Sequence, residues 1–455
     1  MERVREASNA QQTPPLAYVD TYGCQQNESD SEKLCGMLSE MGYGFTGDEY
    51  AADVIIINTC AIRENAENRV YGNVGALVHT KKAKPSQIIA FCGCMAAIPE
   101  VADKIRQSYR HVDLMFSPNN LWRFPEMLYR IMNATGRVFE TEVGDGYIDE
   151  GYPLRRAGKV KAWLPIMYGC DNYCSYCIVP YVRGRERSRK HEVILDEARG
   201  LVADGYKDIT LLGQNVNSYG TGLDEKTNFA EIIKRINEIN GEFLIRFMTS
   251  HPKDASDELF KAMAESEKAA KHIHLPFQAG NDRILKLMNR GYTHVGYLEK
   301  IAAARELMPD IVITSDVIVG FPGETDEEFE DTLRLVEKAR FDAMFTFIYS
   351  KRPGTPAADL PDSSRREEKQ ARFDRLLEIQ NAISEEKHSQ YVGKTVRVLV
   401  DEKSHDERYP LKARTNGGRL VHLRGNTELE GSFIDAEITH CNPWSLFGYC
   451  KNARI

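Results

Sequence analysis

Three cysteines lie close together in the sequence, at Cys170, Cys174 and Cys177, with the spacing C-x3-C-x2-C. Three thiolates can bind three irons of a cubane iron–sulfur cluster, which leaves the fourth iron open to a small molecule. A catalytic zinc site with three sulfurs and a water is an alternative, although zinc cysteines usually occur as paired C-x2-C units. A disulfide is less compatible with so tight a group in a reducing compartment. The spacing therefore favours an iron–sulfur cluster with one open iron.

A second set of three cysteines follows three predicted strands in the first part of the chain. The strands Leu16–Asp20, Val54–Asn58 and Ile88–Phe91 run into Cys24, Cys60 and Cys94, and Val112–Phe116 is a fourth strand. Neighbouring strand ends converge on one edge of an open parallel sheet, so these thiols can meet in space. Burial as small core residues is the alternative, and we expect it for Cys35 and Cys92. The pattern predicts a second three-thiolate metal site.

Strands alternate with amphipathic helices after the first cysteine motif. The predicted strands are Ala162–Tyr168, Asp208–Leu212, Phe243–Met248, His272–Leu275, Ile311–Val319 and Ala343–Tyr349. The predicted helices are Glu192–Asp204, Phe229–Ile239, Ile284–Met288, Val295–Glu306 and Thr325–Ala339. A βα repeat of this kind indicates a parallel sheet with covering helices. We expect an α/β fold: an amino-terminal open parallel α/β domain followed by a partial (βα)6 barrel.

The C-x3-C-x2-C motif resembles that of the radical S-adenosylmethionine (SAM) superfamily, whose fold is also a partial barrel. The resemblance implies that Cys170, Cys174 and Cys177 are catalytic and bind a 4Fe–4S cluster. In that superfamily the open iron binds the amino and carboxylate groups of SAM. The reduced cluster then passes one electron to the sulfonium, which yields a 5′-deoxyadenosyl radical. Tyr176 matches the aromatic position that lies against the adenine of SAM.

Polar residues gather directly after the predicted barrel strands, where such folds place their sites. Gln214, Ser250 and Gln278 are our candidates to bind the amino acid part or the ribose of SAM. Each of them can also be explained as part of a turn or a helix cap. The repeated position after successive strands is the stronger observation.

Five segments resemble the methylthiotransferase family. They are Thr21–Asp30, Asn58–Glu64, Cys92–Cys94, Ser315–Thr325 and Tyr349–Pro356. The resemblance runs from about residue 16 to the end of the chain, and both cysteine triads are complete. Gly23–Asn27 and Cys60–Asn65 look most like the members that modify tRNA carrying dimethylallyladenosine, and Arg183–Arg189 supports that choice.

This resemblance implies methylthiolation of the adenine C-2 position of N6-dimethylallyladenosine beside the anticodon in tRNA. The implied cofactors are SAM and two 4Fe–4S clusters, the second of which carries the sulfur. The implied partners are the modified tRNA, an electron donor of the flavodoxin or ferredoxin type, and iron–sulfur assembly proteins. The alternatives are a methylthiotransferase for threonylcarbamoyl tRNA or a ribosomal protein, a non-enzymatic iron–sulfur carrier, and a zinc-dependent nucleic-acid enzyme.

A basic run follows the first cysteine motif. We expect Arg183, Arg185 and Arg187 to bind RNA, because guanidinium groups bind phosphates and stack on bases. A solvated face with Glu186 as ion-pair partner is the alternative.

The carboxy-terminal part changes character. Ser363–Gln390 reads as a charged helix whose apolar face Gln380 interrupts. Five short strands follow: Thr395–Val400, Leu411–Thr415, Leu420–Leu423, Phe433–Thr439 and Leu446–Tyr449. They indicate a small OB-like β-barrel. By resemblance it is a TRAM-like RNA-binding module.

We therefore expect a disordered tail at 1–15, a methylthiotransferase amino-terminal domain at 16–141, a linker at 142–160, a radical SAM domain with its closing helix at 161–390 and an RNA-binding barrel at 391–455. The chain has a formal charge of −8 and ten cysteines. The sequence contains no apolar run long enough to span a bilayer, and its start does not resemble a signal peptide. We expect a cytoplasmic protein with reduced thiols and no membrane partner.

Overall fold

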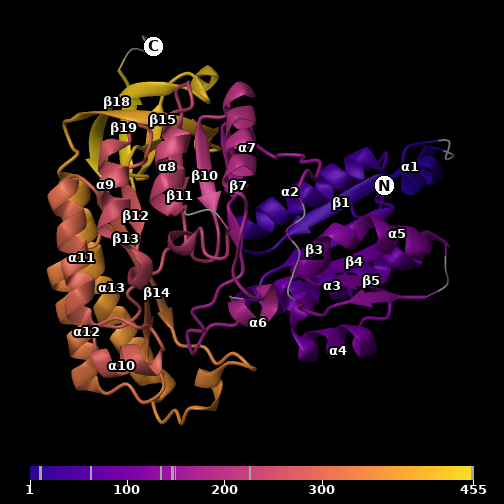
Figure 1. Ribbon diagram of the computed structural model, residues 1–455, viewed down its shortest axis with the longest axis horizontal. Helices are drawn as coiled ribbons and strands as arrows, with labels where there is room; N and C mark the ends of the chain where they lie inside the picture. Colours follow the sequence, from indigo (N-terminus) through magenta and orange to yellow (C-terminus); the bar gives the residue numbers. More distant parts are fainter. Residues whose placement is uncertain are drawn as a thin grey trace. The chain divides into compact units, whose positions relative to one another are not determined.

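The computed structural model describes residues 1–9, 13–61, 64–133, 136–144, 148, 150–224 and 227–451. The chain forms two compact units (Figure 1). The first unit consists of Met1–Ala157, Tyr168–Asp171 and Ile178–Arg187, and the second of Gly158–Met167, Asn172–Cys177 and Ser188–Ile455. Within the described ranges, no helix is both long and apolar enough to cross a bilayer.

The first unit is built on a six-stranded, fully parallel sheet with the order β2-β1-β3-β4-β5-β6. The strands are β1 (Leu16–Thr21), β2 (Gly44–Phe45), β3 (Val54–Thr59), β4 (Ile88–Gly93), β5 (Leu114–Phe116) and β6 (Val138–Glu140). Every residue of β3 is buried, as expected for a parallel strand with both faces covered. The covering helices are α2 (Gln25–Glu40), α3 (Glu64–Ala83), α4 (Pro99–Ser108) and α5 (Phe124–Asn133).

The start of the chain differs from our prediction. Glu2–Asn9 form helix α1, and Val4 on this helix is buried among apolar residues of the first unit. The prediction of a disordered tail is therefore wrong for α1, where the buried Val4 packs against the core of the first unit. Residues 10–12 of that tail lie outside the described residues, as do Ile62 and Arg63 of the second cysteine segment.

The second unit contains the predicted partial barrel. Its strands are β7 (Lys161–Pro165), β10 (Asp208–Leu212), β11 (Leu244–Phe247), β12 (His272–His274), β13 (Val312–Val319) and β14 (Ala343–Ile348). They form two three-stranded parallel sheets, β7-β10-β11 and β12-β13-β14, and Ile245 of β11 forms an isolated parallel bridge with Ala269, which lies shortly before β12. The α/β barrel fold is confirmed.

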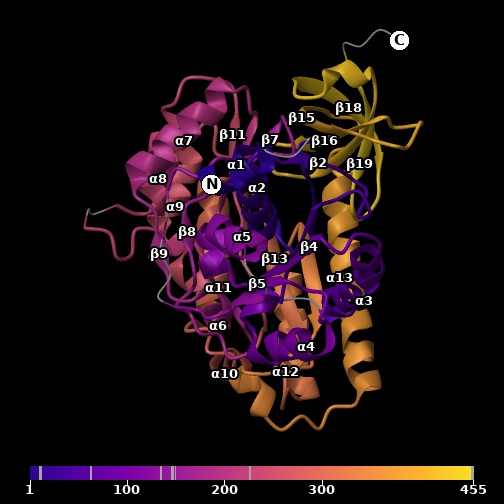
Figure 2. The same ribbon diagram turned by 90° about the vertical axis from the view of Figure 1, so that its right-hand side faces the viewer.

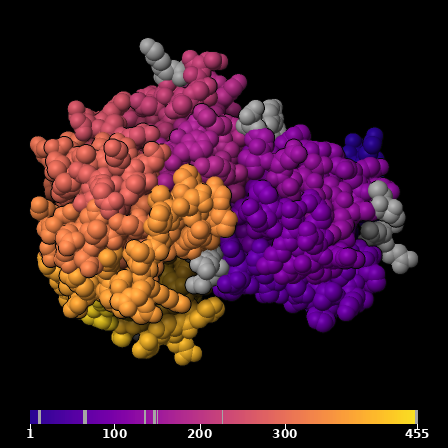
Figure 3. Space-filling model, turned by 90° about the horizontal axis from the view of Figure 1, so that it is seen from below, coloured from indigo at the N-terminus to yellow at the C-terminus, as the bar shows by residue number. Residues whose placement is uncertain are grey.

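Helices surround this barrel on its outer side (Figure 1). They are α7 (His191–Ala203), α8 (Phe229–Asn237), α9 (Asp257–Glu265), α10 (Asp282–Leu287), α11 (His294–Leu307) and α12 (Asp326–Ala339). The apolar faces of α7, α8, α9, α11 and α12 share one core with side chains of the strands, whereas Ile284 and Leu285 of α10 belong to a separate small cluster. Seen from below, the coral-coloured α10 and α11 lie at the surface of this unit (Figure 3).

The last part of the second unit is the long helix α13 (Arg366–Ser389) and a closed five-stranded barrel with the order β15-β16-β17-β19-β18 (Figure 2). The barrel strands are β15 (Thr395–Lys403), β16 (Leu411–Thr415), β17 (Leu420–Arg424), β18 (Phe433–Cys441) and β19 (Leu446–Cys450). Gln380 of α13 is buried rather than disruptive, because its amide nitrogen donates hydrogen bonds to the Phe341 carbonyl oxygen at 3.0 Å and the Ser384 Oγ at 2.9 Å.

The small barrel is attached to the partial barrel by buried polar contacts. Arg246 on β11 donates hydrogen bonds to the carbonyl oxygens of Thr415 at 3.0 Å and Asn416 at 2.8 Å, and pairs with Asp208 at 2.8 Å. Asp342, which precedes β14, forms an ion pair with Arg419 of the small barrel. The turn after β16 is therefore held against the amino-terminal end of the partial barrel.

Candidate active site

Cys24, Cys60 and Cys94 lie at the carboxyl ends of β1, β3 and β4, which are adjacent parallel strands of the first unit. Gly23 has a φ of +145°, and a Cβ placed on it would lie 2.6 Å from the Cβ of Cys60. Gly93 has a φ of +91°, and its Cβ would lie 2.3 Å from the Thr59 carbonyl oxygen. Glycine is required at both positions because the cysteine loops approach too closely for any side chain.

A buried amide pair holds the first two of these loops together. Asn27 donates hydrogen bonds to the Asn58 Oδ1 at 3.1 Å and to the Thr59 carbonyl oxygen at 3.0 Å. Asn58 donates in return to the Asn27 carbonyl oxygen and the Ser31 Oγ, both at 2.9 Å. Asn27 lies one helical turn after Cys24, and Asn58 lies two residues before Cys60. The pair therefore fixes the position of both thiols relative to each other.

The thiols of this triad have unequal proton affinities. A hydrogen bond from Cys60 lowers the pKa of Cys24 to about 6, and the positive charge of Arg183 acts in the same direction. Burial raises the pKa of Cys94, although Arg183 opposes that effect. Burial also raises the pKa of Cys92, which stays a core thiol as predicted. Cys24 caps the amino terminus of α2, a position that favours a thiolate.

Arg183 ends helix α6 (Val179–Arg183) and is only 5% exposed. Its Nε donates a hydrogen bond to the Cys94 Sγ at 3.2 Å, and its Nη2 donates to the Asp30 Oδ2 at 2.9 Å. These contacts do not favour RNA binding by Arg183, which stays a prediction. Its guanidinium group is buried against the second cysteine triad and is already paired.

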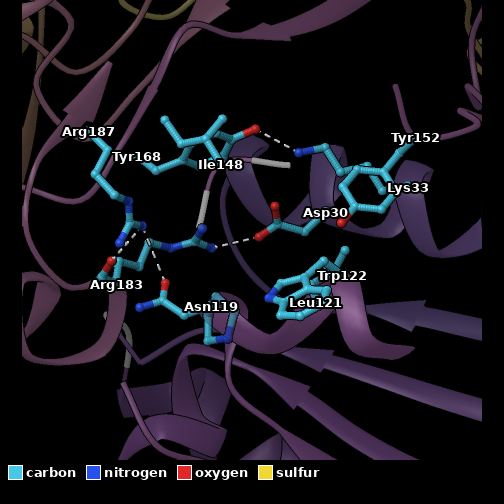
Figure 4. A pocket seen from close by; sticks show the side chains of 11 residues that line it. Asp30, Lys33, Asn119, Leu121, Trp122, Ile148, Tyr152, Tyr168, Arg183 and Arg187 are labelled. Carbon is cyan, nitrogen blue, oxygen red and sulfur yellow. Dashed lines mark hydrogen bonds and ion pairs between the residues drawn. The ribbon is translucent and has the colours of Figure 1, made fainter. Parts of the chain in front are cut away.

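A pocket lies next to Arg183 and Asp30 in the first unit (Figure 4). Lys33 points across it to the Tyr168 hydroxyl at 2.6 Å, and the exposed indole of Trp122 forms another wall. The pocket combines aromatic faces with positively charged groups. One of these groups, Arg183, lines the pocket and also contacts the Cys94 sulfur.

The other cysteine motif is divided between the units, since Cys170 belongs to the first and Cys174 and Cys177 belong to the second. All three thiols are buried or half-buried. In the second unit, the loop is stabilised by Asn289, whose side chain donates hydrogen bonds to the carbonyl oxygens of Asn172 at 3.1 Å and Tyr173 at 2.9 Å. Tyr173 and Asn289 both have positive φ angles, +44° and +57°.

A buried arginine also contacts this motif. Arg290 donates from Nη1 to the Cys174 Sγ at 3.2 Å and to the Tyr176 hydroxyl at 3.4 Å. It also donates from Nε to the Tyr292 hydroxyl at 3.0 Å and from Nη2 to the Pro276 carbonyl oxygen at 2.8 Å. Burial raises the pKa of Tyr176 well above its ordinary value, so its hydroxyl stays protonated.

The three predicted SAM-binding residues follow successive strands of the partial barrel. Gln214 follows β10 and is half-buried, Ser250 follows β11, and Gln278 follows β12. Ser250 and Gln278 are 5% and 7% exposed, yet the Ser250 Oγ and the Gln278 Oε1 have no hydrogen-bond partner among the described residues. Gln278 and Thr249 also have φ angles of +67° and +73°, a costly conformation for side-chain-bearing residues.

Further unpartnered polar atoms lie after the same strands. The Asn217 amide after β10 and the His251 Nε2 after β11 are buried with no hydrogen-bond partner in the described ranges. Burial lowers the pKa of His251 to about 2, so its ring is neutral. Its Nδ1 accepts a hydrogen bond from the Lys253 backbone at 3.1 Å, which leaves Nε2 as the protonated nitrogen and a donor. Buried polar atoms without partners are rare and fit a polar ligand such as SAM.

Both triads offer sulfur donors of the kind that bind iron–sulfur clusters. In the part of the chain that the structure describes, no three Cys, His, Asp or Glu side chains lie at metal-ligand spacing. Ligation by either triad therefore stays a prediction.

Comparison with known families covers most of the chain. Residues 16–117 match Uncharacterized protein family UPF0004, residues 164–336 match the Radical SAM superfamily, and residues 389–450 match the TRAM domain. The tRNA-2-methylthio-N(6)-dimethylallyladenosine synthase of Acetivibrio thermocellus is 51% identical over 433 residues, which cover 95% of this chain and 90% of the relative. The relative of the same name from Alkaliphilus oremlandii is 49% identical over 430 residues, which cover 94% and 91%.

The chain belongs to this synthase family. The resemblance read from the sequence is confirmed. A solved structure of the radical SAM methyltransferase TsrM from Kitasatospora setae, with tryptophan and a SAM analog bound, is also similar, with a TM-score of 0.56. At 12% identity over 75% of each chain, this similarity shows the fold alone.

For this member of the synthase family, the predicted arginine run divides into buried and exposed members. The side chain of Arg185 is 67% exposed and pairs with Asp171 at 3.0 Å. Arg187 is half-buried, and its Nη2 donates to the Asn119 Oδ1 at 3.4 Å and to the Arg183 carbonyl oxygen at 3.3 Å. Arg189 is buried and paired with Glu197 at 2.9 Å. RNA contact by Arg185 and Arg187 stays a prediction.

Sequence reasoning missed Asn27, Asn58, Asp30 and Arg290. Asn27 and Asn58 lie within three residues of a cysteine of the first unit, but Arg290 and Cys174 are 116 residues apart in the chain. Asn27, Asp30 and Asn58 lie in segments that resemble the methylthiotransferase family, but the sequence assigned them no role, and Arg290 lies in none of those segments.

Proposed function

We propose that this protein replaces the C-2 hydrogen of N6-dimethylallyladenosine beside the anticodon of tRNA with a methylthio group. One observation carries the proposal: the chain has two separate three-cysteine sets, one after three strands of the first unit's parallel sheet and one in a loop that follows β7. Generation of a radical from SAM requires only one cluster, so a second set has a different task. Delivery of sulfur is the task that fits a methylthio product.

Cys170, Cys174 and Cys177 would bind one 4Fe–4S cluster, and Cys24, Cys60 and Cys94 would bind the other. When bound, these clusters and SAM would supply the carbon-centred radical, the sulfur and the methyl group that the reaction requires. The protein has to hold both groups and keep water away from a reactive radical. Burial of Cys60, Cys94, Cys170 and Cys174 supports that requirement.

The polar residues after the barrel strands would orient SAM. The Ser250 Oγ and the Gln278 Oε1 are available to accept or donate hydrogen bonds to its amino acid part or ribose. The neutral His251 ring offers a donor from Nε2 in the same region of the barrel. The Tyr176 hydroxyl is held by Arg290, which directs its ring to a fixed position for the adenine.

The substrate is an adenine inside an RNA stem-loop, so the base must leave its stack to reach the sulfur. The dimethylallyl group should be required, because its burial would help to hold the base; each buried methylene contributes about 0.8 kcal/mol. The small carboxy-terminal barrel supports an RNA partner.

We also propose a flavodoxin- or ferredoxin-type electron donor, iron–sulfur assembly proteins as partners, and a cytoplasmic location, where tRNA is modified.

The test is a parallel reaction of the anaerobically reconstituted protein with four substrates, followed by mass spectrometry. These are dimethylallyl tRNA, the same tRNA without the prenyl group, threonylcarbamoyl tRNA and a ribosomal-protein peptide. We expect methylthiolation of dimethylallyl tRNA and much slower reaction of the unprenylated form. Preference for either of the last two would contradict the substrate. Absence of SAM cleavage under reducing conditions would instead indicate a carrier, and zinc without iron would indicate a zinc enzyme.

A further inference from the structure

Each predicted cysteine triad contains one sulfur that accepts a hydrogen bond from a buried arginine. In the first unit, Arg183 donates to Cys94, and in the second, Arg290 donates to Cys174, each at 3.2 Å. Both arginine residues are 5% exposed. Buried arginine is uncommon, and its positive charge is costly to bury unless it is compensated. The same arrangement in two unrelated folds therefore requires an explanation.

Local structure holds both guanidinium groups in place. Arg183 is the last residue of α6, and the following Gly184 has a φ of +74° and ends the helix. Arg290 lies in the tight turn after α10, between Asn289 and Gly291, which have φ angles of +57° and +68°. Each guanidinium group makes at least one further hydrogen bond, so neither side chain is free to turn away from its sulfur.

The two arginine residues differ in what balances their charge. Arg183 is paired with the buried carboxylate of Asp30 at 2.9 Å, which compensates most of its charge. Arg290 contacts two tyrosine hydroxyls and one carbonyl oxygen, and no carboxylate in the described ranges lies within ion-pair distance of it. The Cys174 sulfur is therefore close to an uncompensated positive charge, whereas the Cys94 sulfur is close to a nearly neutral pair.

We propose that Arg183 and Arg290 are positioning residues that hold one ligand sulfur of each cluster and set its reduction potential. The inference rests on the proposed two-cluster function. Reduction adds one electron from the external donor to the cluster and makes it more negative. Hydrogen bonds to cysteine sulfur and nearby positive charge stabilise that state, so both raise the potential. Arg290 has the larger effect, because no carboxylate offsets it.

The test measures midpoint potentials by redox titration followed by electron paramagnetic resonance. One triad is replaced by alanine so that each sample contains a single cluster. With only the Cys170 triad present, we expect Arg290→Gln to lower the potential by about 59 mV or more, equivalent to a tenfold change in the one-electron equilibrium. Arg290→Lys keeps the charge and should recover most of that shift. An unchanged potential in Arg290→Gln with full iron content would overturn the inference.

The second part of the test uses the other cluster. Here Arg183→Gln and Asp30→Asn should shift the midpoint potential in opposite directions. With only the Cys24 triad present, Arg183→Gln should lower the potential, by less than Arg290→Gln does at its own cluster. Asp30→Asn should raise it, because Arg183 then becomes uncompensated. A purely structural role for this pair predicts no such reversal, and a lower potential in Asp30→Asn would contradict the proposal. This conservative variant keeps the test decisive if Arg183→Gln loses its cluster.

Arg246→Gln is the matched control, because Arg246 is a buried arginine paired with Asp208, and its hydrogen-bond partners among the described residues include no cysteine. Its potentials should equal those of the unsubstituted protein. The failures are distinguishable. If the unsubstituted protein binds only one cluster, the proposed function is contradicted. If it binds two clusters and their potentials are the same in Arg290→Gln, Arg290→Lys, Arg183→Gln and Asp30→Asn, only this inference is contradicted.

Discussion

Single sulfur atoms carry the chemistry proposed for this protein, and their surroundings differ. Cys24 has a lowered pKa, Cys94 a raised one, and Cys35 on the same helix as Cys24 has a pKa that burial raises to about 11. Burial therefore disfavours the thiolate of Cys35, whereas the surroundings of Cys24 favour its thiolate. This contrast makes Cys35 a suitable control for every cysteine substitution.

Replacement of the two triads should separate their roles. Changing Cys170, Cys174 and Cys177 to alanine should remove about half of an expected total of about eight irons, together with all SAM cleavage. Changing Cys24, Cys60 and Cys94 should remove the other half but leave SAM cleavage intact, since the radical needs only the first cluster. Iron analysis and detection of 5′-deoxyadenosine and of the methylthio nucleoside check both results.

Cys35→Ala should keep all iron and full activity. A methylthio product from the Cys24, Cys60 and Cys94 variant would show that the sulfur comes from elsewhere. Continued formation of 5′-deoxyadenosine by the other triple variant would remove Cys170, Cys174 and Cys177 from the mechanism.

The elements that position these residues are held by buried charged groups. The turn between β13 and α12 contains Glu324, which is 4% exposed, accepts a hydrogen bond from the Gly320 N–H at 2.8 Å and pairs with Arg372 of α13 at 3.2 Å. Burial raises the pKa of Glu324 to about 7, although the hydrogen bond from Gly320 and the charge of Arg372 oppose it. This turn links the closing helix to the carboxyl end of the barrel.

The Glu324 carboxyl should make stability depend on pH. Because its pKa is raised in the folded state, its ionisation favours the unfolded chain, so its own contribution to stability is greatest below pH 4.5 and is lost as the pH rises to about 7. The difference amounts to about 3 kcal/mol at most. Glu324→Gln removes this titration, so its stability relative to the unsubstituted protein should rise between pH 4.5 and 7. Melting temperatures across this range measure the effect.

Glu328 provides a control with the opposite sign. It accepts hydrogen bonds from Arg283 and from the Thr325 N–H in the capping box of α12, and the bonds from Arg283 lower its pKa. Its contribution is present above pH 4.5 and is lost as the pH falls below that value. Glu328→Gln should therefore be most destabilising at neutral pH. The same pH trend in both variants would contradict the assignment of Glu324.

At the scale of the whole molecule, the small barrel is attached to the rest of the second unit by two kinds of ion pair. Asp342 is 2% exposed and binds Arg419 of the barrel, Lys387 of α13 at 3.1 Å and the Ile313 N–H at 2.8 Å. Glu242 and Arg397 also join the two parts, but their side chains are 60% and 64% exposed.

Asp342→Asn should loosen the small barrel, because it leaves the buried Arg419 charge without compensation, at a cost of about 3–5 kcal/mol. Glu242→Gln removes an exposed pair between the same parts and should cost less than about 1 kcal/mol. Thermal unfolding and protease cleavage between α13 and β15 measure the difference. Equal effects of the two substitutions would show that the Asp342 pair does not hold the barrel.

Binding of tRNA should depend on salt through the exposed arginine of the basic run. If Arg185 contacts a phosphate, Arg185→Ala should lower the slope of log affinity against log salt by about one. Arg199→Ala is the control, because Arg199 is also exposed and ion-paired, with Asp196 at 2.6 Å on α7. An unchanged slope in Arg185→Ala would show that Arg185 contacts no phosphate and forms only a surface ion pair with Asp171.

The sequence by itself determined the two cysteine triads, the βα repeats, the five-stranded barrel and the family. Strand and helix periodicity, turn residues and the C-x3-C-x2-C spacing are local features, whereas Cys24, Cys60 and Cys94 were grouped because each follows a predicted strand. The predicted strands agree with the structure to within a few residues, as for Asp208–Leu212 and Leu411–Thr415, which form β10 and β16 without change.

Only the tertiary structure decided the roles of the charged residues. Arg183 looks like one member of an exposed basic run, but it is buried because Asp30 and Cys94, 153 and 89 residues away in the chain, accept its hydrogen bonds. Arg290 carries no sequence signal at all, and its contact with Cys174 depends on a turn after α10. The energy of a charge depends on burial and on its partners in space, and neither can be read from neighbouring residues in a sequence.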